Sequence, residues 1–145
     1  MSLSVPKTGE IRVTESRALV FVDAKIIGRH DPMFPKNSFV AYFSEDAGVH
    51  GFSPVDADQT DEAELKAIDF AIKELRGKLR SFTIMCDNES VVSQINRALV
   101  RPSSRHVLLE ILAEMKANHG ITVEFFGKNP AHSFLNQEIA RLQGQ

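Results

Sequence analysis

The sequence has no tryptophan, one tyrosine and a single cysteine, Cys86. A lone cysteine cannot form an internal disulfide, which is typical of proteins from reducing compartments. Cys86 lies in an apolar stretch, where we expect an inert core thiol. It forms no zinc-ligand spacing with the histidines, so the sequence argues against a zinc site.

Long hydrophobic runs and an excess of positive charge are also missing. No apolar run reaches the roughly 18 residues that a membrane span needs, and residues 1–16 lack the apolar core of a signal peptide. We therefore expect a cytoplasmic protein with no membrane partner. The formal net charge is −2, so a nucleic-acid partner would have to be held by a local patch or through metal ions.

The composition that remains is that of an ordinary globular protein. Hydrophobic residues make up 43% and charged residues 25% of a chain of 145 residues, which is enough for one well-buried domain and short for two. We expect residues 1–16 to form a flexible lead or an edge segment. Residues 17–145 should form a single domain.

Hydrophobic periodicity and turn residues predict an α/β fold. The expected order is strand–strand–strand–helix–strand–helix–helix–strand–helix, a five-stranded mixed sheet flanked by helices on both faces. The expected strands are 18–22, 38–44, 49–54, 81–87 and 121–126. The expected helices are 60–77, one from about residue 88, one that follows Pro102 and ends at Gly120, and a short one over 134–142 after a loop at 127–133.

The helix at 60–77 carries one acid that faces inward. Its apolar residues recur at helical spacing and predict packing on the sheet. Thr60 is the expected N-cap and Gly77 the expected C-terminal stop. At about 100° per residue, Glu64 lies roughly 60° from the middle of the apolar stripe. A carboxylate there is costly to bury alone, which favours a bound cation.

Two further acids follow apolar strands. Asp23 ends the first strand and Asp87 ends the fourth, and ligand sites of open α/β sheets lie beyond such strand ends. Glu64, expected in the first helical turn, would approach the same edge. Three carboxylates close together favour Mg²⁺ or Mn²⁺, which can hydrolyse phosphodiesters by a two-metal route. The alternative for each acid alone is a helix cap or a solvated turn residue.

These residues also carry a family resemblance. The segments AELKAI around Glu64, CDNES around Asp87 and NQEIARL from Asn136 resemble motifs of the ribonuclease H type 1 family, over about residues 17–142. The resemblance implies a ribonuclease H-like fold with a divalent-metal nuclease site. That site would cleave the RNA strand of RNA–DNA hybrids, with Asp23, Glu64 and Asp87 as its first three catalytic and metal-binding carboxylates.

The first motif departs from the family pattern. The family usually has Asp-Gly-Ser at this point, whereas here Asp23 is followed by Ala24 and Lys25. Lys25 thus places a long cation where the backbone normally turns beside the substrate.

The last motif departs further. The fourth carboxylate is expected four residues after Asn136, and that position is Ala140. Glu138 is not a replacement, because two helical residues rotate it by about 200°. We therefore expect Ala140 to face the metal site and to leave one ion short of a ligand. His132 corresponds to the family's catalytic loop histidine, or else is a polar turn residue.

The remaining candidates are contacts to nucleic acid. They are Lys25, Asn88, Arg97, Arg101, Arg105 and Asn136. The arginines could contact phosphates, which positions a substrate without reading its sequence. They could equally be solvated residues around the helix junction at Pro102.

Three functions remain open at this point. The first is a metal-dependent nuclease with a reduced ligand set, acting slowly on RNA–DNA hybrids or on another nucleic acid. The second is a catalytically degenerate domain of the same fold that binds nucleic acid or serves as a scaffold. The third is an exonuclease of the same superfold, although the sequence after Asp23 lacks the second acid of a D-x-E pair.

Overall fold

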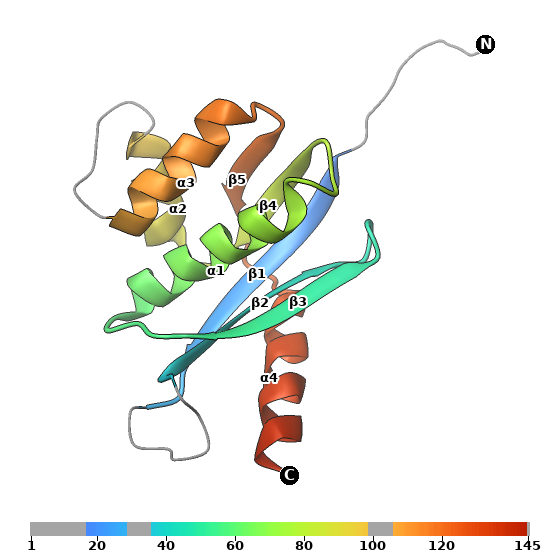
Figure 1. The fold of residues 1–145 in the computed structure, drawn as a ribbon, viewed down its shortest axis with the longest axis vertical. Helices are drawn as coiled ribbons and strands as arrows, with labels where there is room; N and C mark the ends of the chain where they lie inside the picture. Colours follow the sequence, from blue (N-terminus) through green and yellow to red (C-terminus); the bar gives the residue numbers. More distant parts are fainter. Residues whose placement is uncertain (1–16, 29–35, 99–105, 145) are drawn as a thin grey trace.

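The computed structural model describes residues 17–28, 36–98 and 106–144 (Figure 1). The predicted order of strands and helices is confirmed. The elements are β1 (Ala18–Ile26), β2 (Ser38–Ser44), β3 (Val49–Val55), α1 (Thr60–Leu75), β4 (Phe82–Cys86), α2 (Glu89–Ala98), α3 (His106–Ala117), β5 (Ile121–Phe125) and α4 (Pro130–Gln143).

The strands form one mixed sheet in the order β3-β2-β1-β4-β5. β1, β2 and β3 pair antiparallel, whereas β4 runs parallel to both β1 and β5. Gly48 closes the β2–β3 hairpin with a φ of 66°, which glycine adopts without steric cost. Its N–H donates to the Glu45 carbonyl at 3.2 Å.

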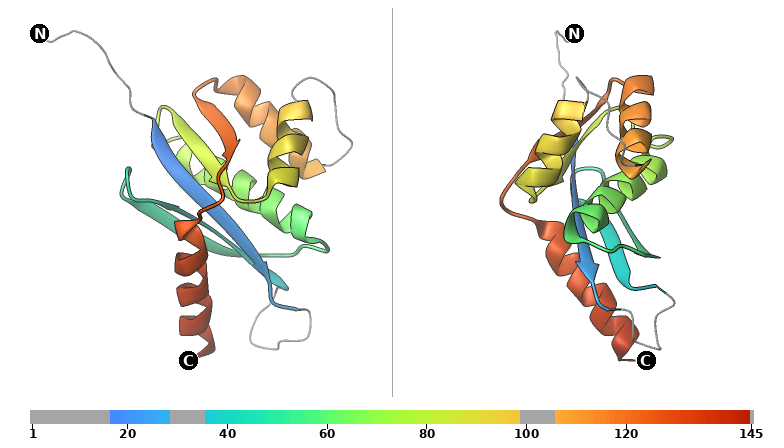
Figure 2. Two further views of the ribbon diagram at one scale, coloured as in Figure 1. Left: turned by 180° about the vertical axis from the view of Figure 1, so that it is seen from behind. Right: turned by 90° about the vertical axis from the view of Figure 1, so that its left-hand side faces the viewer.

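The two faces of the sheet are covered by different helices. Alternate strand residues point to opposite faces, so Val20 and Val22 of β1 join the core that includes α1. Phe39 and Ala41 of β2 instead pack against α4. The views in Figure 2 place α4 across the sheet from α1, as predicted for a sheet with helices on both faces.

Several boundaries differ from the expected ones. β1 continues past Asp23 to Ile26, because residues 21–26 pair with β2. The N-cap position of α1 is Gln59 and not Thr60, and the Gln59 side chain makes no capping hydrogen bond. The helix ends at Arg76 in right-handed helical geometry, so Gly77 is not a left-handed stop. Glu64 accordingly lies in the second turn of α1, not in the first.

The predicted start of α4 was also wrong. The helix begins at Pro130, four residues before the expected start, in a segment predicted to be a loop. Asn129 caps this helix: its side chain accepts a hydrogen bond from the Ala131 N–H, and Pro130 follows at the first helical position. His132 is therefore a helix residue. Within the described residues, no helix is both long and apolar enough to cross a bilayer.

Candidate metal centre

The candidate site lies where β1 extends beyond β4. The β1–β4 pairing ends at Phe21 and Met85, and the same register extended by two residues would align Asp23 with Asp87. Val22 and Ala24 present their backbone groups to one edge of β1, since alternate residues do so. The Val22 carbonyl accepts from Asn129 Nδ2 at 2.8 Å. The Ala24 backbone lies near the carboxyl groups of both Asp23 and Glu64, where it favours their ionised forms and so opposes the rise of their pKa values.

Three potential metal ligands lie close together at the end of β4. One donor atom each from Glu64, Cys86 and Asp87 lies within 4.8 Å of the others. Glu64 is only 6% exposed, whereas Asp87 is exposed to solvent. Cys86 Sγ lies 4.0 Å from Glu64 Oε1. The site thus combines a buried acid from α1 with an accessible acid that directly follows β4.

Without a metal ion, burial and mutual repulsion disfavour the ionised forms of Glu64 and Asp23. Burial, followed by the charges of Asp23 and Asp87, raises the pKa of Glu64 to about 8. Burial also raises the pKa of Asp23, against the opposing effect of its hydrogen bond from His132. A divalent cation would favour the ionised carboxylates instead. The carboxylate oxygens are hard donors and fit Mg²⁺ or Mn²⁺.

A histidine also lies at the site, in contact with Asp23. His132 Nδ1 lies 2.9 Å from Asp23 Oδ2, and His132 Nε2 lies 3.1 Å from Asn136 Nδ2. Lys25 Nζ donates to Asn136 Oδ1 at 3.2 Å. Because the lysine fixes the amide orientation, Asn136 donates to Nε2, and Nδ1 carries the ring proton toward Asp23. The four side chains form one directed chain of hydrogen bonds that ends on Asp23.

Ala140 does not occupy the position beside Asp23. It is exposed and lies eight residues after His132, which is about 12 Å further along the helix axis. The α4 residue that contacts Asp23 is His132, in the first turn. A carboxylate that replaced His132 would therefore approach Asp23 more directly than one at position 140.

Comparisons with solved structures give matches across most of the chain. The foamy viral protease-reverse transcriptase matches in complexes with double-stranded DNA and with an RNA/DNA hybrid, with TM-scores of 0.62 and 0.58 and identities of 16% and 15%. These matches cover 85% and 92% of this chain, and 89% and 21% of the matched chains. The ribonuclease H domain of prototype foamy virus matches at a TM-score of 0.58 and 17% identity, covering 87% of this chain and 91% of that one.

A cellular enzyme has the same architecture. Ribonuclease H1 from the halophilic archaeon Halobacterium salinarum matches at a TM-score of 0.56 and 15% identity, covering 78% of this chain and 87% of that one. The chain has a ribonuclease H-like fold. No protein-family model and no curated protein sequence matches it.

Within this ribonuclease H-like fold, the other candidate residues lie as follows. Asn88 caps α2, since its Oδ1 accepts from the Val91 N–H at 3.1 Å and its Nδ2 donates to Asp61 at 3.1 Å. Its side chain therefore stabilises the start of α2 and its contact with α1. Its role in nucleic-acid binding stays a prediction. Arg97 is exposed in the last turn of α2. Arg101 and Arg105 lie outside the described residues.

Sequence reasoning missed two residues of the site. Cys86 is fully buried, as expected, but its thiol faces the acids. Burial raises its pKa to about 12, so it remains a thiol at neutral pH. Asn129 links the start of α4 to β1. The pair Asn129-Pro130 is a recognisable helix start, whereas nothing in the sequence indicated the orientation of Cys86.

Asn129 gives a first testable prediction. Asn129→Ala should lower the free energy of unfolding by about 1–2 kcal/mol, because it removes the helix cap and the bond to the Val22 carbonyl. Asn129→Ser keeps a capping acceptor and loses the bond to Val22, so it should cost less. Urea denaturation of the two variants measures the difference. Equal stability of Asn129→Ala and wild type would contradict the role assigned to this side chain.

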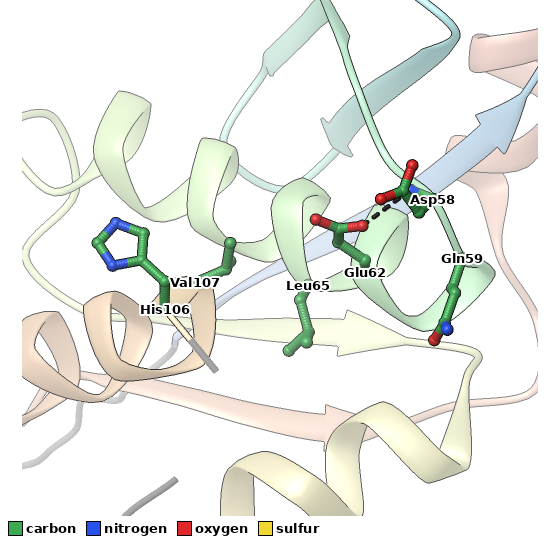
Figure 3. Close-up of a pocket in the computed structure, with 6 residues that line it drawn as sticks. All are labelled: Asp58, Gln59, Glu62, Leu65, His106 and Val107. Carbon is green, nitrogen blue, oxygen red and sulfur yellow. Dashed lines mark hydrogen bonds between the residues drawn. The ribbon is translucent and has the colours of Figure 1, made fainter. Parts of the chain in front are cut away.

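A separate cavity of about 350 Å³ lies between the starts of α1 and α3 (Figure 3). It is lined by Asp58, Gln59, Glu62, Leu65, His106 and Val107. The Asp58 N–H donates to Glu62 Oε1 at 2.8 Å across its rim. None of these residues belongs to the group of acids around Glu64, so the cavity is distinct from the candidate metal centre.

Proposed function

We propose that this protein is a metal-dependent nuclease that hydrolyses phosphodiester bonds of nucleic acid, most specifically the RNA strand of RNA–DNA hybrids. One observation carries the proposal. A buried glutamate, Glu64, faces the exposed Asp87 at the end of β4, within reach of the charge of Asp23. A buried acid beside two other acids destabilises the fold unless a cation binds there, so its presence indicates a cation site.

The roles of the residues follow from their positions. Glu64, Asp87 and Asp23 would hold Mg²⁺ or Mn²⁺, which supplies an activated water and stabilises the charge of the leaving oxygen. Asp87 is exposed and would meet the substrate side. Lys25 and Arg97 are exposed cations that would contact phosphates without reading sequence.

The substrate class is supported by fold and by analogy. The foamy viral protease-reverse transcriptase, which matches this fold, has been determined in complex with an RNA/DNA hybrid. The histidine in place of a carboxylate beside Asp23 leaves fewer ligands than two ions require. We therefore propose that catalysis is slow, and faster with Mn²⁺, which is less demanding of geometry than Mg²⁺.

A second candidate function is favoured by the same histidine. The hydrogen bond between His132 and Asp23 partly offsets the burial of that acid without any metal. A domain that has lost catalysis and binds nucleic acid or serves as a scaffold would keep its fold with such a pair. The two candidates differ in whether any hydrolysis occurs.

The experiment is a cleavage assay with end-labelled substrates of one sequence: an RNA–DNA hybrid, single-stranded RNA, double-stranded RNA and double-stranded DNA. We expect cleavage of the RNA strand in the hybrid with Mn²⁺, slower cleavage with Mg²⁺ and none in EDTA. Hybrid binding is measured in parallel by fluorescence anisotropy. Binding with no cleavage, at excess protein and with either ion, would refute the nuclease and establish the binding domain.

A further inference from the structure

We infer that the site takes a single divalent ion, on the Glu64 and Asp87 side of Asp23, and that His132 holds the opposite side of Asp23 in place of a second ion. This inference rests on the proposed metal centre. It changes the expected chemistry from a two-ion to a one-ion site, and it assigns His132 as a positioning residue for Asp23.

The first step concerns the oxygens of Asp23. Two catalytic ions lie about 3.5–4 Å apart and share a bridging carboxylate, which gives one oxygen to each ion. The Oδ2 atom of Asp23 already accepts from His132 Nδ1 at 2.9 Å. Asp23 is 7% exposed at its side chain, so it has little freedom to turn this oxygen elsewhere. An ion on this side of Asp23 would therefore have to displace the hydrogen bond from His132.

The second step is that His132 is not poised to be a ligand itself. A histidine binds a metal through an unprotonated ring nitrogen. Nε2 of His132 accepts from Asn136 Nδ2 at 3.1 Å, and the amide is fixed in that orientation by the bond from Lys25 to its oxygen. Nδ1 is then protonated and donates to Asp23. Both ring nitrogens are used, and the Lys25 ammonium adds a positive charge that disfavours a cation nearby.

The third step concerns the other elements on this side of Asp23. α4 carries one acid, Glu138, which pairs with Arg141 on the same helix. The neighbour of Asp23 on β2 is Ala41. Among the described residues, α4 and β2 therefore offer no free carboxylate to an ion there. The opposite side has two, Glu64 and Asp87, with donor atoms within 4.8 Å of each other.

The test counts ions on the whole chain. Calorimetric titration with Mn²⁺ should give one ion per chain for wild type. His132→Asp replaces the ring with a carboxylate in the first turn of α4, where the helix dipole favours negative charge, and should give two. A second Mn²⁺ about 3.5–4 Å from the first should also produce a spin-coupled electron paramagnetic resonance spectrum.

Two variants are matched controls. His132→Asn removes the imidazole without adding charge, and Ala140→Asp adds a carboxylate on the same helix about 12 Å away along its axis. Both should retain one ion and an uncoupled spectrum. Two ions in Ala140→Asp would overturn the assignment to His132. One ion in a folded His132→Asp variant would show that His132 does not exclude the second ion.

Wild type alone tests the inference if the variant does not fold. Two ions in wild type would overturn it while leaving the proposed metal centre intact, whereas no bound ion would refute the metal centre itself. A nuclear magnetic resonance titration with diamagnetic Mg²⁺ adds a second measurement. The ring nitrogens of His132 should keep the Nδ1–H tautomer at saturation, and loss of that tautomer would mean that an ion displaces the histidine.

Discussion

Glu64→Gln is expected to stabilise the metal-free protein, by an amount that increases from pH 4.5 to about pH 8. The pKa of Glu64 rises from its ordinary 4.5 to about 8 in the folded state, through burial and the charges of Asp23 and Asp87. Between these values the folded protein binds a proton that the unfolded chain has released. Stability therefore falls as pH rises through this window. Gln has the shape of the protonated acid and removes this penalty.

The expected gain near pH 8 is on the order of 3 kcal/mol, and it should vanish near pH 4. Urea denaturation in EDTA across this range measures it. Glu89→Gln, at an exposed acid in the first turn of α2, is the matched control and should change stability little at any pH. Saturating Mn²⁺ should reverse the order, because wild type, with all of its carboxylates, gains more free energy of ion binding than the variant. A Glu64→Gln variant less stable than wild type at pH 8 in EDTA would contradict the burial argument.

Asp87→Asn is expected to reduce hydrolysis of an RNA–DNA hybrid by at least about 100-fold, since a lost metal ligand removes several kcal/mol of transition-state stabilisation. Asp87 is exposed, so the amide opens no cavity and the fold should be unchanged. Relief of the repulsion with Glu64 and Asp23 should even raise the stability of the metal-free protein slightly.

The control for this experiment is an exposed acid on the strand next to β4. Glu124 of β5 pairs in register with Met85 of β4, near Asp87 but outside the group of metal ligands. Glu124→Gln should cleave as wild type does. Circular dichroism and thermal melts confirm that both variants fold. If Asp87→Asn cleaves the labelled hybrid at the wild-type rate, the assigned metal site is wrong.

The sequence predicted best where the local pattern and the tertiary fold agree. The bounds of β2 were predicted correctly, because its aromatic and β-branched residues are followed by a turn that ends in Gly48. The inward orientation of Glu64 followed from helical periodicity alone, and the structure buries this side chain. The two aspartates were located by the apolar strands that precede them.

The errors have two different physical causes. β1 continues beyond Asp23 because Ala24, Lys25 and Ile26 pair with β2, and a tertiary pairing of this kind has no local signal. The start of α4 did have a signal, Asn129-Pro130, which was interpreted as a turn. The predicted loop therefore included His132, and the predicted helix had only Asn136 and Ala140 to present to the site. The contact between His132 and Asp23 joins residues 109 positions apart, so only the folded chain reveals it.

Alkylation of Cys86 can measure how often the buried region around the site opens. Its thiol is the only one in the sequence and is fully buried against Glu64. Alkylating reagents attack the thiolate of an accessible cysteine, so the native packing of β4 against α1 shields it twice, by occlusion and by its high pKa. The alkylation rate of Cys86 in the native protein therefore measures transient opening of the packing between β4 and α1. Solvent exposure of the interior of the site can thus be measured at a natural residue, without an introduced cysteine.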